Sequence, residues 1–476
     1  MAAFLRTIVI VGGGFSGTAV AINLLRNPPR RPTRVVLIDR DGAFGRGLAY
    51  AQRDFPYLLN VPAGRMSARA EAPLEFLQFA QRRYAQAGAH DFLPRAVFGD
   101  YLNELLITAQ LQSPRHVLLE RLQATVVAVQ RTERHLQLRV ALASGQELYA
   151  DDVVLALGNP PQTELAPCAA IRTSAAYFPE PWSRNWDLHA QRSALIIGTG
   201  LTMADVVFRS TAVPELTPRM HALSRHGLIA PEQTQFRPDA FKGNGEALLL
   251  AASSSLRRVV DVTRILANEA QSLGGDWREA VNFVRHMAPT LWQRMPAPDR
   301  QRFLRHLRSY WDIHRHRPAP QVLRRIRAAQ STQRLQVHAG RIQEMAPAAT
   351  GIRVRWTPRG RSETRELHVD QVINCTGPDY NPIAARDPLI RQLLNAGLIT
   401  CDAHRLGIRT GAHCAVVDRD GWPGPHLFYI GPMLRADHWE ATAVAELRVH
   451  AARLASHLAT TGESNNGSVT ALERAS

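Results

Sequence analysis

Two glycine-rich turns, each between an apolar strand and a helix, constrain the fold of this chain more than any other feature. The first turn follows the β-branched strand Thr7–Val11 and has the spacing Gly12-x-Gly14-x-x-Gly17. The segment after it, Thr18–Leu25, consists mostly of helix-forming residues. A strand, a glycine turn and a helix in this order predict the start of a βαβ unit in a parallel sheet.

The first turn has the features of a dinucleotide-binding site. Its glycines allow a tight turn, a close approach of a pyrophosphate to the backbone, and close packing of the helix on the strand. Ser16 lies at the helix N-terminus, where N–H groups and the helix dipole favour an anion. The next strand, Arg34–Ile38, ends on Asp39, and we expect this carboxylate to accept the hydroxyls of an adenosine ribose. The alternative is a glycine turn that binds nothing.

The same order of elements begins again in the second half of the chain. The strand Ser193–Ile197 leads into the turn Gly198-Thr199-Gly200, and a helix is expected from Thr202 to Arg209. The repeat predicts a second dinucleotide-binding unit.

The second turn departs from the first at two places. Met203 stands where a third glycine would stand, which leaves the packing of the helix open. The next strand ends on Ser224-Arg225-His226, where an NAD-binding unit would have a carboxylate. A hydroxyl and basic groups suit the 2′-phosphate of NADPH, so we favour NADPH over NADH. The alternative is that Arg225 only faces solvent.

The layout predicts an α/β fold with two Rossmann-like dinucleotide-binding domains and a helical insert. Two more strands end in small-residue turns, at Gly158 and Gly377, and such turns mark the crossings between the two nucleotide domains. The expected segments are 1–165 and 377–460 for the first domain, 187–376 for the second domain, 245–330 for the insert within it, and 461–476 for a disordered tail.

Apolar periodicity predicts further elements. Within the insert, Asp299–Arg317 is expected to form one helix with Phe303, Leu307, Tyr310, Trp311 and His314 on one face. Another helix is expected at Pro73–Ala87, and strands are expected at Ala124–Val129, Leu136–Ala141, Asp152–Leu157, Ile352–Trp356, Gln371–Asn374 and Leu427–Ile430.

Composition narrows the class of protein. The net charge is +16, but the arginines are scattered through periodic segments and no nucleic-acid-binding signature is present, so we expect no nucleic-acid partner. No apolar run approaches the ~20 residues that span a bilayer. The four cysteines include no C-x-x-C pair, which indicates a reducing, cytoplasmic compartment and argues against a redox dithiol. No spacing of side chains indicates a metal site.

Long motifs in order along nearly the whole chain carry a family resemblance. They are the first glycine turn, Phe44–Tyr50, Leu58–Ala63 with Met66-Ser67, Pro94-Arg95, Phe98–Leu102, Gly198–Thr202, Trp311–Arg317, Gly431–Arg435, Trp439–Val444 and Glu446–Arg448. In these motifs the chain resembles the bacterial FAD/NAD(P)-binding family that includes an FAD-dependent urate hydroxylase and a flavin-dependent aspartate N-monooxygenase.

The resemblance implies a flavin monooxygenase. FAD would occupy the first turn, and NADPH or NADH the second. The reduced flavin would take up O₂ as a C4a-hydroperoxide and pass one oxygen to the substrate. Urate is the first substrate expected. The alternative is N-hydroxylation of aspartate or another small amine, and an alternative of another class is a non-catalytic FAD/NAD(P)-sensing protein. The sequence leaves the oligomeric state open.

The resemblance also implies which residues form the flavin site. Arg46, Asn60, Val61 and Met66 would lie against the isoalloxazine. Gly431 and Arg435 would close over the flavin. From its position in a strand, the backbone of Val126 or Val127 is expected to hold the adenine edge. The alternative for each of them is ordinary loop packing.

The insert is the candidate substrate module. His314, Arg315 and His316 could meet an anionic substrate. The catalytic candidates are His314 and Arg315 together with Asn60 and Arg435. The alternative is that Trp311 and His314 belong to the core of the insert and that Arg315 faces water.

Overall fold

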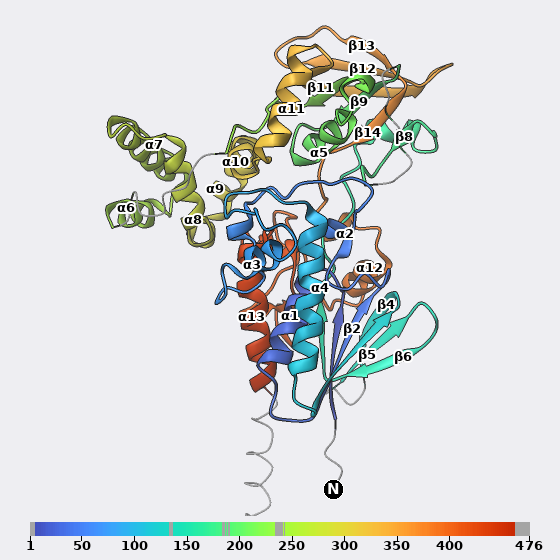
Figure 1. Cartoon of the computed structure of the whole chain (residues 1–476), viewed down its shortest axis with the longest axis vertical. Helices are drawn as coiled ribbons and strands as arrows, with labels where there is room; N and C mark the ends of the chain where they lie inside the picture. The colour runs from blue at the N-terminus through green and yellow to red at the C-terminus, as the bar shows by residue number, and fades with distance from the viewer. Residues whose placement is uncertain are drawn as a thin grey trace, which may run out of the picture. The chain divides into compact units, whose positions relative to one another are not determined.

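The structure, a computed structural model, describes residues 5–132, 137–182, 186, 188, 191–233, 241 and 243–461. The chain forms two compact units, which we describe separately (Figure 1). The first unit consists of Met1–Pro56, Val61–Pro160 and Tyr380–Ser476, and the second of Tyr57–Asn60 and Pro161–Asp379. Apart from Thr461, the tail that is expected to be disordered lies outside the described residues.

A mostly parallel sheet forms the core of the first unit, with the spatial order β15-β16-β7-β1-β2-β3. Its parallel strands are β1 (Arg6–Val11), β2 (Thr33–Asp39), β3 (Val117–Gln123), β7 (Asp152–Leu155) and β16 (Pro423–Tyr429), and β15 (Ala415–Val417) is antiparallel at one edge. Ile8, Val9 and Ile10 in β1 are fully buried, as expected of a strand covered on both faces. The Rossmann-like arrangement predicted for this unit is confirmed.

Helix α1 (Phe15–Arg26) is the central helix of the first unit. It packs against α4 (Arg95–Gln112) and α13 (Val444–Thr460), which lie beside it in Figure 1. Every residue from Ser16 to Leu25 is buried, because helices cover α1 as well as the sheet. The shorter helices of this unit are α2 (Gly47–Tyr50), α3 (Glu75–Gln81) and α12 (Pro388–Asn395).

The expected helix at Pro73–Ala87 is wrong in length, because α3 ends at Gln81. Beyond that point the chain folds back in turns closed by the N–H of Tyr84 on the carbonyl of Ala80 and the N–H of Ala87 on the carbonyl of Tyr84 (both 2.8 Å). The Gln81 side chain also donates to the Ala87 carbonyl (2.9 Å) and holds the reversal.

A small antiparallel sheet completes the first unit, and its strands are β4 (Val126–Arg131), β5 (Leu138–Leu142) and β6 (Glu147–Ala150). The register between β4 and β5 shifts between Val126 and Ala128, so Val127 is the bulged residue. The side chain of Gln392 in α12 accepts from the N–H of Val129 (2.9 Å) and donates to its carbonyl (3.1 Å). This pair of bonds fixes α12 on the small sheet.

The second unit has its own sheet, with the order β13-β12-β11-β10-β9-β14-β8. The parallel strands are β8 (Tyr177–Phe178), β9 (Ser193–Ile197), β10 (Arg219–Ser224), β11 (Leu335–Pro347) and β14 (Gln371–Asn374), and β12 (Ile352–Pro358) and β13 (Arg365–Val369) extend the edge as antiparallel strands. Helices α5 (Leu201–Ser210) and α11 (Pro320–Ser331) pack on each other. A second Rossmann-like sheet is therefore confirmed.

The insert in the second unit is helical, as predicted. Its helices are α6 (Asn244–Ala252), α7 (Leu256–Ser272), α8 (Arg278–Arg294), α9 (Ala297–Arg302) and α10 (Arg308–Arg315). Helices α6, α7 and α8 pack together around a core of their own that includes Leu249, Leu266 and Phe283 (Figure 1).

The helix expected at Asp299–Arg317 is present over most of this range, but it is not a regular α-helix, because a π-helical turn, η4 (Phe303–Leu307), stands between α9 and α10. The helix also stops at Arg315. Pro318 disfavours a helical conformation at Arg317, and the Arg317 side chain turns back to donate to the His314 carbonyl (2.9 Å).

Short 3₁₀ helices connect the larger elements, and they are η1 (Ala63–Arg65), η2 (Ala166–Ile171), η3 (Pro214–Leu216), η5 (Pro382–Ala384), η6 (Ala412–Cys414) and η7 (Pro432–Ala436). Among the described residues, no helix has the length and the apolar character to cross a membrane.

Candidate functional site

The first glycine turn lies at the carboxyl ends of β1, β2 and β7. The N–H of Gly12 donates to the Ile38 carbonyl (2.8 Å), and the N–H of Ala156 donates to the Val11 carbonyl (2.7 Å). Gly12 has a φ of +112°, and a Cβ there would stand 2.1 Å from the carbonyl oxygen of Ala156. Only glycine fits this position.

The helix after this turn offers backbone donors to a ligand. Gly14 is the N-cap of α1 and provides no side-chain cap, so N–H groups of the first turn are left for another acceptor. A Cβ at Gly14 would meet only the Cα of Gly47, at 3.7 Å, among the described atoms. At Gly17 a Cβ would stand 2.0 Å from the Gly12 carbonyl oxygen, so glycine is needed for packing. Ser16 is buried in the same turn.

Asp39 fixes the loops around the first turn. Its carboxylate accepts the N–H groups of Gly13 (3.0 Å), Asp41 (3.0 Å) and Ala43 (3.1 Å). The carboxylate therefore lies at the strand end where a ribose is expected, and it also holds the turn itself. Ribose binding by Asp39 stays a prediction.

The segment after Asp39 returns to the glycine turn. The N–H of Gly45 donates to the Gly13 carbonyl (2.8 Å), and Gly47 packs on Gly14. Arg46, which is expected to lie against the isoalloxazine, is held by a carboxylate: its Nη2 donates to Asp100 (3.1 Å). Burial would raise the pKa of Asp100, but the hydrogen bonds from Arg53 and Arg46 outweigh it and hold that pKa below its usual value.

The second glycine turn repeats the geometry of the first. The N–H of Gly198 donates to the Leu223 carbonyl (2.8 Å), and the N–H of Cys375 donates to the Ile197 carbonyl (2.8 Å). Gly198 has a φ of +106°, and a Cβ there would stand 2.4 Å from the Cys375 carbonyl oxygen. Met203, at the place of the third glycine, is 1% exposed and forms part of the packing of α5.

At the end of β10, Ser224 takes the position that Asp39 has in the first unit. Its Oγ lies 2.9 Å from Oγ1 of Thr199 and accepts the N–H of Gly227 (3.0 Å). Gly200 is the uncapped N-cap of α5, and a Cβ added there would have no described atom within 4 Å. Thr202 lies in the first turn of α5, and Arg225 is exposed. The second turn thus has the anchor and the open helix end of the first, without the carboxylate.

The small-residue turns at the crossings are open. Gly158 and Gly377 have positive φ angles of +68° and +88°, and a Cβ added at either glycine would have no described atom within 4 Å. In the second unit the N–H of Thr163 donates to the Gly377 carbonyl (3.0 Å), and Gln162 and Pro378 form an antiparallel bridge. The segments before and after this unit's sheet are therefore joined to each other.

The residues expected at the isoalloxazine fall in both units. Val61 is half-buried and Met66 is 4% exposed, and both belong to the first unit. Asn60 belongs to the second unit, where its carbonyl accepts from the side chain of Gln233 (3.3 Å). The same amide of Gln233 donates to the Arg317 carbonyl (3.0 Å), so one side chain fixes Asn60 beside the end of the insert.

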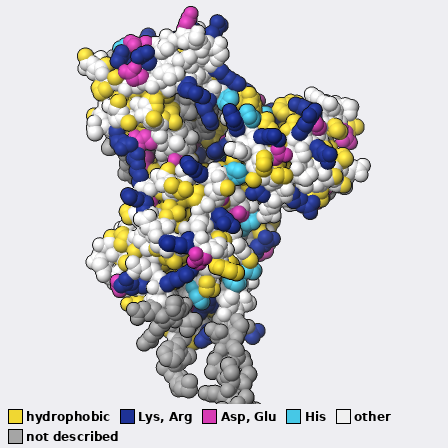
Figure 2. Space-filling view, turned by 180° about the vertical axis from the view of Figure 1, so that it is seen from behind, with side chains coloured by type: hydrophobic (Ala, Val, Ile, Leu, Met, Phe, Trp, Pro, Cys, Tyr) yellow, Lys and Arg dark blue, Asp and Glu magenta, His cyan; other side chains and the backbone are white. Residues whose placement is uncertain are grey.

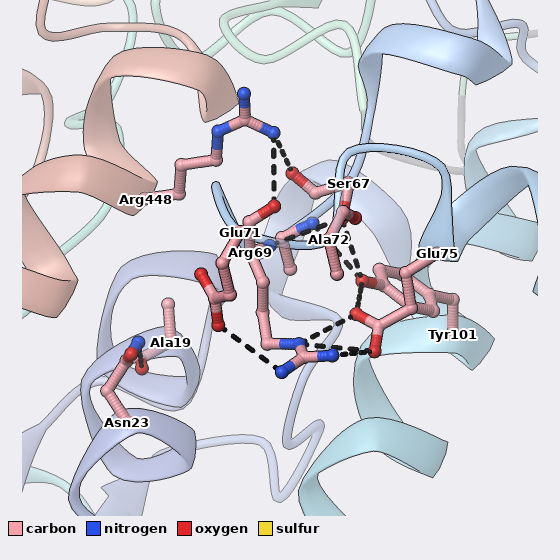
Figure 3. Close-up of polar contacts among 10 residues, drawn as sticks. Ala19, Asn23, Ser67, Arg69, Glu71, Ala72, Glu75, Tyr101 and Arg448 are labelled. Atoms are coloured by element: carbon pink, nitrogen blue, oxygen red, sulfur yellow. Dashed lines mark hydrogen bonds and ion pairs between the residues drawn. The ribbon is translucent and has the colours of Figure 1, made fainter. Parts of the chain in front are cut away.

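A buried polar cluster holds the loop that follows Met66 (Figure 3). Nη1 of Arg448 in α13 donates to the Ser67 carbonyl (2.8 Å). The hydroxyl of Tyr101 accepts the N–H of Ala68 (3.2 Å) and donates to Glu75 (2.6 Å). Sequence reasoning gave these residues no role, although Tyr101 and Arg448 belong to the motifs of the family resemblance.

Arg435 is buried beside aromatic rings. Arg435 lies in η7, the short helix that begins after Gly431, and it is 7% exposed. Its guanidinium lies 4.1 Å from the centre of the Trp439 ring and 5.3 Å from the centre of the Tyr380 ring. A cation held against aromatic faces is stabilised in place. Its expected contact with a flavin stays a prediction.

In the insert, His314 and Trp311 lie in different surroundings. Trp311 packs on the core of the insert, and the His314 ring meets the edge of Trp277 (5.2 Å). Nδ1 of His314 is buried and has no hydrogen-bond partner among the described residues. Burial, with the charges of Arg317 and Arg278, lowers the pKa of His314. Arg315 is half-buried. Substrate contact by His314 and Arg315 stays a prediction.

Among the described residues, no group of three possible ligands could hold a metal ion. The two glycine turns each present an open helix end, a kind of site that suits a diphosphate.

Comparisons with known proteins bear on the fold and the cofactors. Residues 9–160 match the FAD-NAD(P)-binding family. They form an FAD/NAD(P)-binding domain. No curated protein matches the chain.

Several solved structures share the fold. An ornithine N-hydroxylase from Kutzneria sp. 744, solved with reduced FAD, NADP⁺ and L-ornithine, is 16% identical with a TM-score of 0.63, and the match covers 96% of this chain and 100% of that one. An L-lysine 6-monooxygenase from Pseudomonas syringae is 16% identical (TM-score 0.61, 95% and 98% covered). A bacillithiol disulfide reductase from Staphylococcus aureus is 10% identical (TM-score 0.54, 96% and 99% covered). These likenesses establish the fold.

Proposed function

We propose that the chain is an FAD-dependent monooxygenase that takes electrons from NADPH and hydroxylates the nitrogen of a small amine. The observation that carries the proposal is the matched pair of glycine turns. Gly12 and Gly198 make the same backbone hydrogen bonds and the same close contact, and each precedes a helix whose N-terminus no described side chain caps. An enzyme that passes a hydride from a nicotinamide to a flavin needs two such sites.

The residues of the first unit fit FAD. The diphosphate would bind the amides at the start of α1, above Gly14, where a Cβ would meet no described atom but the Cα of Gly47. Asp39 would accept the ribose hydroxyls, and the backbone at the bulge of Val127 would be available to the adenine. Bound FAD would supply the electron and oxygen chemistry. The protein's part is to hold the ring, to position the substrate and to exclude water.

The choice of an amine rests on the proteins that share the fold. The ornithine and lysine hydroxylases act on primary amines and match this chain over almost its full length. Urate, the first substrate expected from the sequence, has no comparable support. An anionic substrate nevertheless suits the half-buried Arg315 and the neighbouring His314, so urate is the second substrate to test.

Disulfide reduction, the reaction of another protein with this fold, is not favoured by the cysteines. All four are free thiols. Burial raises the pKa of each of them, to about 11 for Cys401 and about 12 for Cys414. Thiol–disulfide exchange needs a thiolate, so these thiols are poor nucleophiles.

The proposal predicts a yellow protein whose NADPH oxidation is stimulated by its substrate. NADPH consumption, hydroxylamine formation and peroxide release should be measured with ornithine, lysine, cadaverine, aspartate and urate. Stimulation by an amine with hydroxylamine formation supports the proposal. Stimulation by urate alone would replace the amine with urate. A protein that binds FAD but is reduced by neither NADPH nor NADH is better explained as a nucleotide sensor.

A further inference from the structure

We propose that Arg225, His226 and Arg359 form the binding site for the 2′-phosphate of NADPH, and that Tyr310 of the helical insert forms one wall of it. The inference rests on the proposed function, because it deepens the assignment of NADPH to the second unit. It gives the insert a role in recognising the dinucleotide, in addition to any role toward the substrate.

The position of the cluster follows from the equivalence of the two turns. Ser224 occupies the place of Asp39, the residue expected to meet the ribose of the other dinucleotide. Arg225 and His226 directly follow Ser224, so they lie at the strand end where the 2′-position of a ribose would lie. Ser224 adds a hydroxyl and no negative charge.

Arg359 joins this strand end from the turn between β12 and β13. Its Nη1 lies 2.7 Å from Nδ1 of His226, and its N–H donates to the Ala339 carbonyl (2.9 Å). A guanidinium can only donate, so Nδ1 of His226 is the acceptor and the ring proton is on Nε2. Two guanidiniums and one ring N–H therefore gather at the end of β10.

The charge of the two guanidiniums is not balanced by a carboxylate among the described residues. On the face shown in Figure 2, Asp and Glu side chains lie among the basic side chains. Elsewhere exposed arginines form ion pairs, such as Arg139 with Glu147 and Arg172 with Glu164. Within the part of the chain that the structure describes, neither Arg225 nor Arg359 makes an ion pair, and both are exposed. Burial, and then the charges of Arg359 and Arg225, lower the pKa of His226. Unbalanced positive charge in reach of one histidine is the environment that a phosphate dianion favours.

The insert reaches the same histidine. The ring of Tyr310 in α10 lies 5.7 Å from the ring of His226, and Tyr310 is 41% exposed. The next residue, Trp311, packs instead on the core of the insert and near Phe303 (6.3 Å). The π-helical turn Phe303–Leu307 comes just before α10, and one extra residue rotates a helix by roughly 100°. The π turn thus allows Trp311 to enter the core while Tyr310 stays at the nucleotide site.

Binding of nucleotide fragments tests the site without any turnover. The affinities of 2′,5′-ADP and 5′-AMP for the FAD-loaded protein should be compared by calorimetry. We expect 2′,5′-ADP to bind roughly 10- to 100-fold more tightly, the effect of one charge-assisted hydrogen bond or more. Arg359→Ala should remove at least about tenfold of this preference and leave 5′-AMP binding unchanged. Arg361→Ala, an exposed arginine in the same turn, is the matched control and should leave both affinities within about twofold.

The role of the insert has its own variant. Tyr310→Ala should weaken binding of 2′,5′-ADP more than binding of 5′-AMP, whereas Tyr310→Phe should retain both affinities, because the ring and not the hydroxyl forms the wall. Equal binding of the two fragments by the unmodified protein would overturn the proposed phosphate site. Unchanged affinities in Tyr310→Ala would overturn the proposed role of the insert in that site. A protein that prefers 2′,5′-ADP but is never reduced by NADPH would refute the proposed function and leave this inference standing.

Discussion

The substitution Gly14→Ala separates cofactor binding from folding. Gly14 has a φ of −72°, which any residue adopts, and a Cβ there would be in ordinary contact with the Cα of Gly47 at 3.7 Å. The methyl group would nevertheless stand over the helix end where the diphosphate is expected to approach the backbone. We therefore expect Gly14→Ala to fold normally but to bind FAD poorly.

The expected magnitudes differ enough to be measured. Alanine in place of glycine stabilises by about 0.4–1 kcal/mol through the unfolded chain, and alanine at an N-cap costs a similar amount. The free energy of unfolding of the FAD-free protein should therefore change by less than about 1 kcal/mol. Loss of one charge-assisted hydrogen bond to the diphosphate costs about 1.5–3 kcal/mol, so the Kd for FAD should rise roughly 10- to 100-fold or more.

Two further variants serve as controls. Gly200→Ala places a methyl group at the N-terminus of the second helix, and this methyl group would have no described atom within 4 Å. The variant should bind NADPH more weakly and still bind FAD. Gly12→Ala would place a Cβ 2.1 Å from the backbone oxygen of Ala156 at a positive φ, and it should unfold the first unit.

FAD content, FAD titration of the stripped protein and thermal unfolding followed by circular dichroism measure these effects. The reasoning is refuted if Gly14→Ala binds FAD with the affinity of the unmodified protein, because the diphosphate then lies elsewhere. A large loss of stability in the FAD-free variant would instead show that the space above Gly14 is filled.

Three other predictions concern the rest of the first unit. Burial lowers the pKa of His450 to about 4, so stability should fall as the pH drops from about 6.5 toward 4, by about 3 kcal/mol in urea unfolding, and His450→Gln should remove most of this dependence. Asp152→Asn leaves the guanidinium of Arg6, 2.6 Å away and 9% exposed, without its ion partner, and should cost about 3–5 kcal/mol of unfolding free energy; an unchanged urea midpoint contradicts this. Arg448→Ala removes the donor on the Ser67 carbonyl and should weaken FAD binding and alter the flavin spectrum, with partial rescue by Arg448→Lys; identical spectra in all three proteins would mean that this loop does not contact the flavin.

Local signals in the sequence were sufficient for the elements that carry the two turns. Strands β9 and β14 have the predicted bounds, and β1 and α1 contain the predicted segments. A β-branched run ended by glycines has few alternative structures, because glycine is needed where φ is positive and the strand is buried on both faces. The second turn was predictable despite Met203, since the two glycines and the strand before them determine the bend.

Contacts between distant segments were not predictable. Arg359 lies more than a hundred residues from His226, and nothing in the local sequence of the turn marks it as part of a nucleotide site. Gln233 is likewise joined to Asn60 only by the fold. The π turn near Phe303 escaped prediction because one inserted residue leaves an apolar pattern that still resembles a single helix. In contrast, helix α4 was assigned no structure although its buried residues recur at helical spacing, so that omission was avoidable.

The exchange of Asp39 for Ser224 distinguishes the nucleotide preference of the two sites more clearly than the glycines, which the two turns share. Asp39 accepts the backbone N–H of Gly13 in the first turn, and Ser224 contacts the hydroxyl of Thr199 in the second turn, so each side chain holds its own turn. Only Asp39 brings a negative charge to the strand end, and a 2′-phosphate about 4 Å from it would be repelled by about 1 kcal/mol per charge even in water. A free ribose hydroxyl, as in FAD, instead gains an acceptor. The same framework with one exchanged side chain can thus direct the unphosphorylated dinucleotide to the first unit and the phosphorylated one to the second.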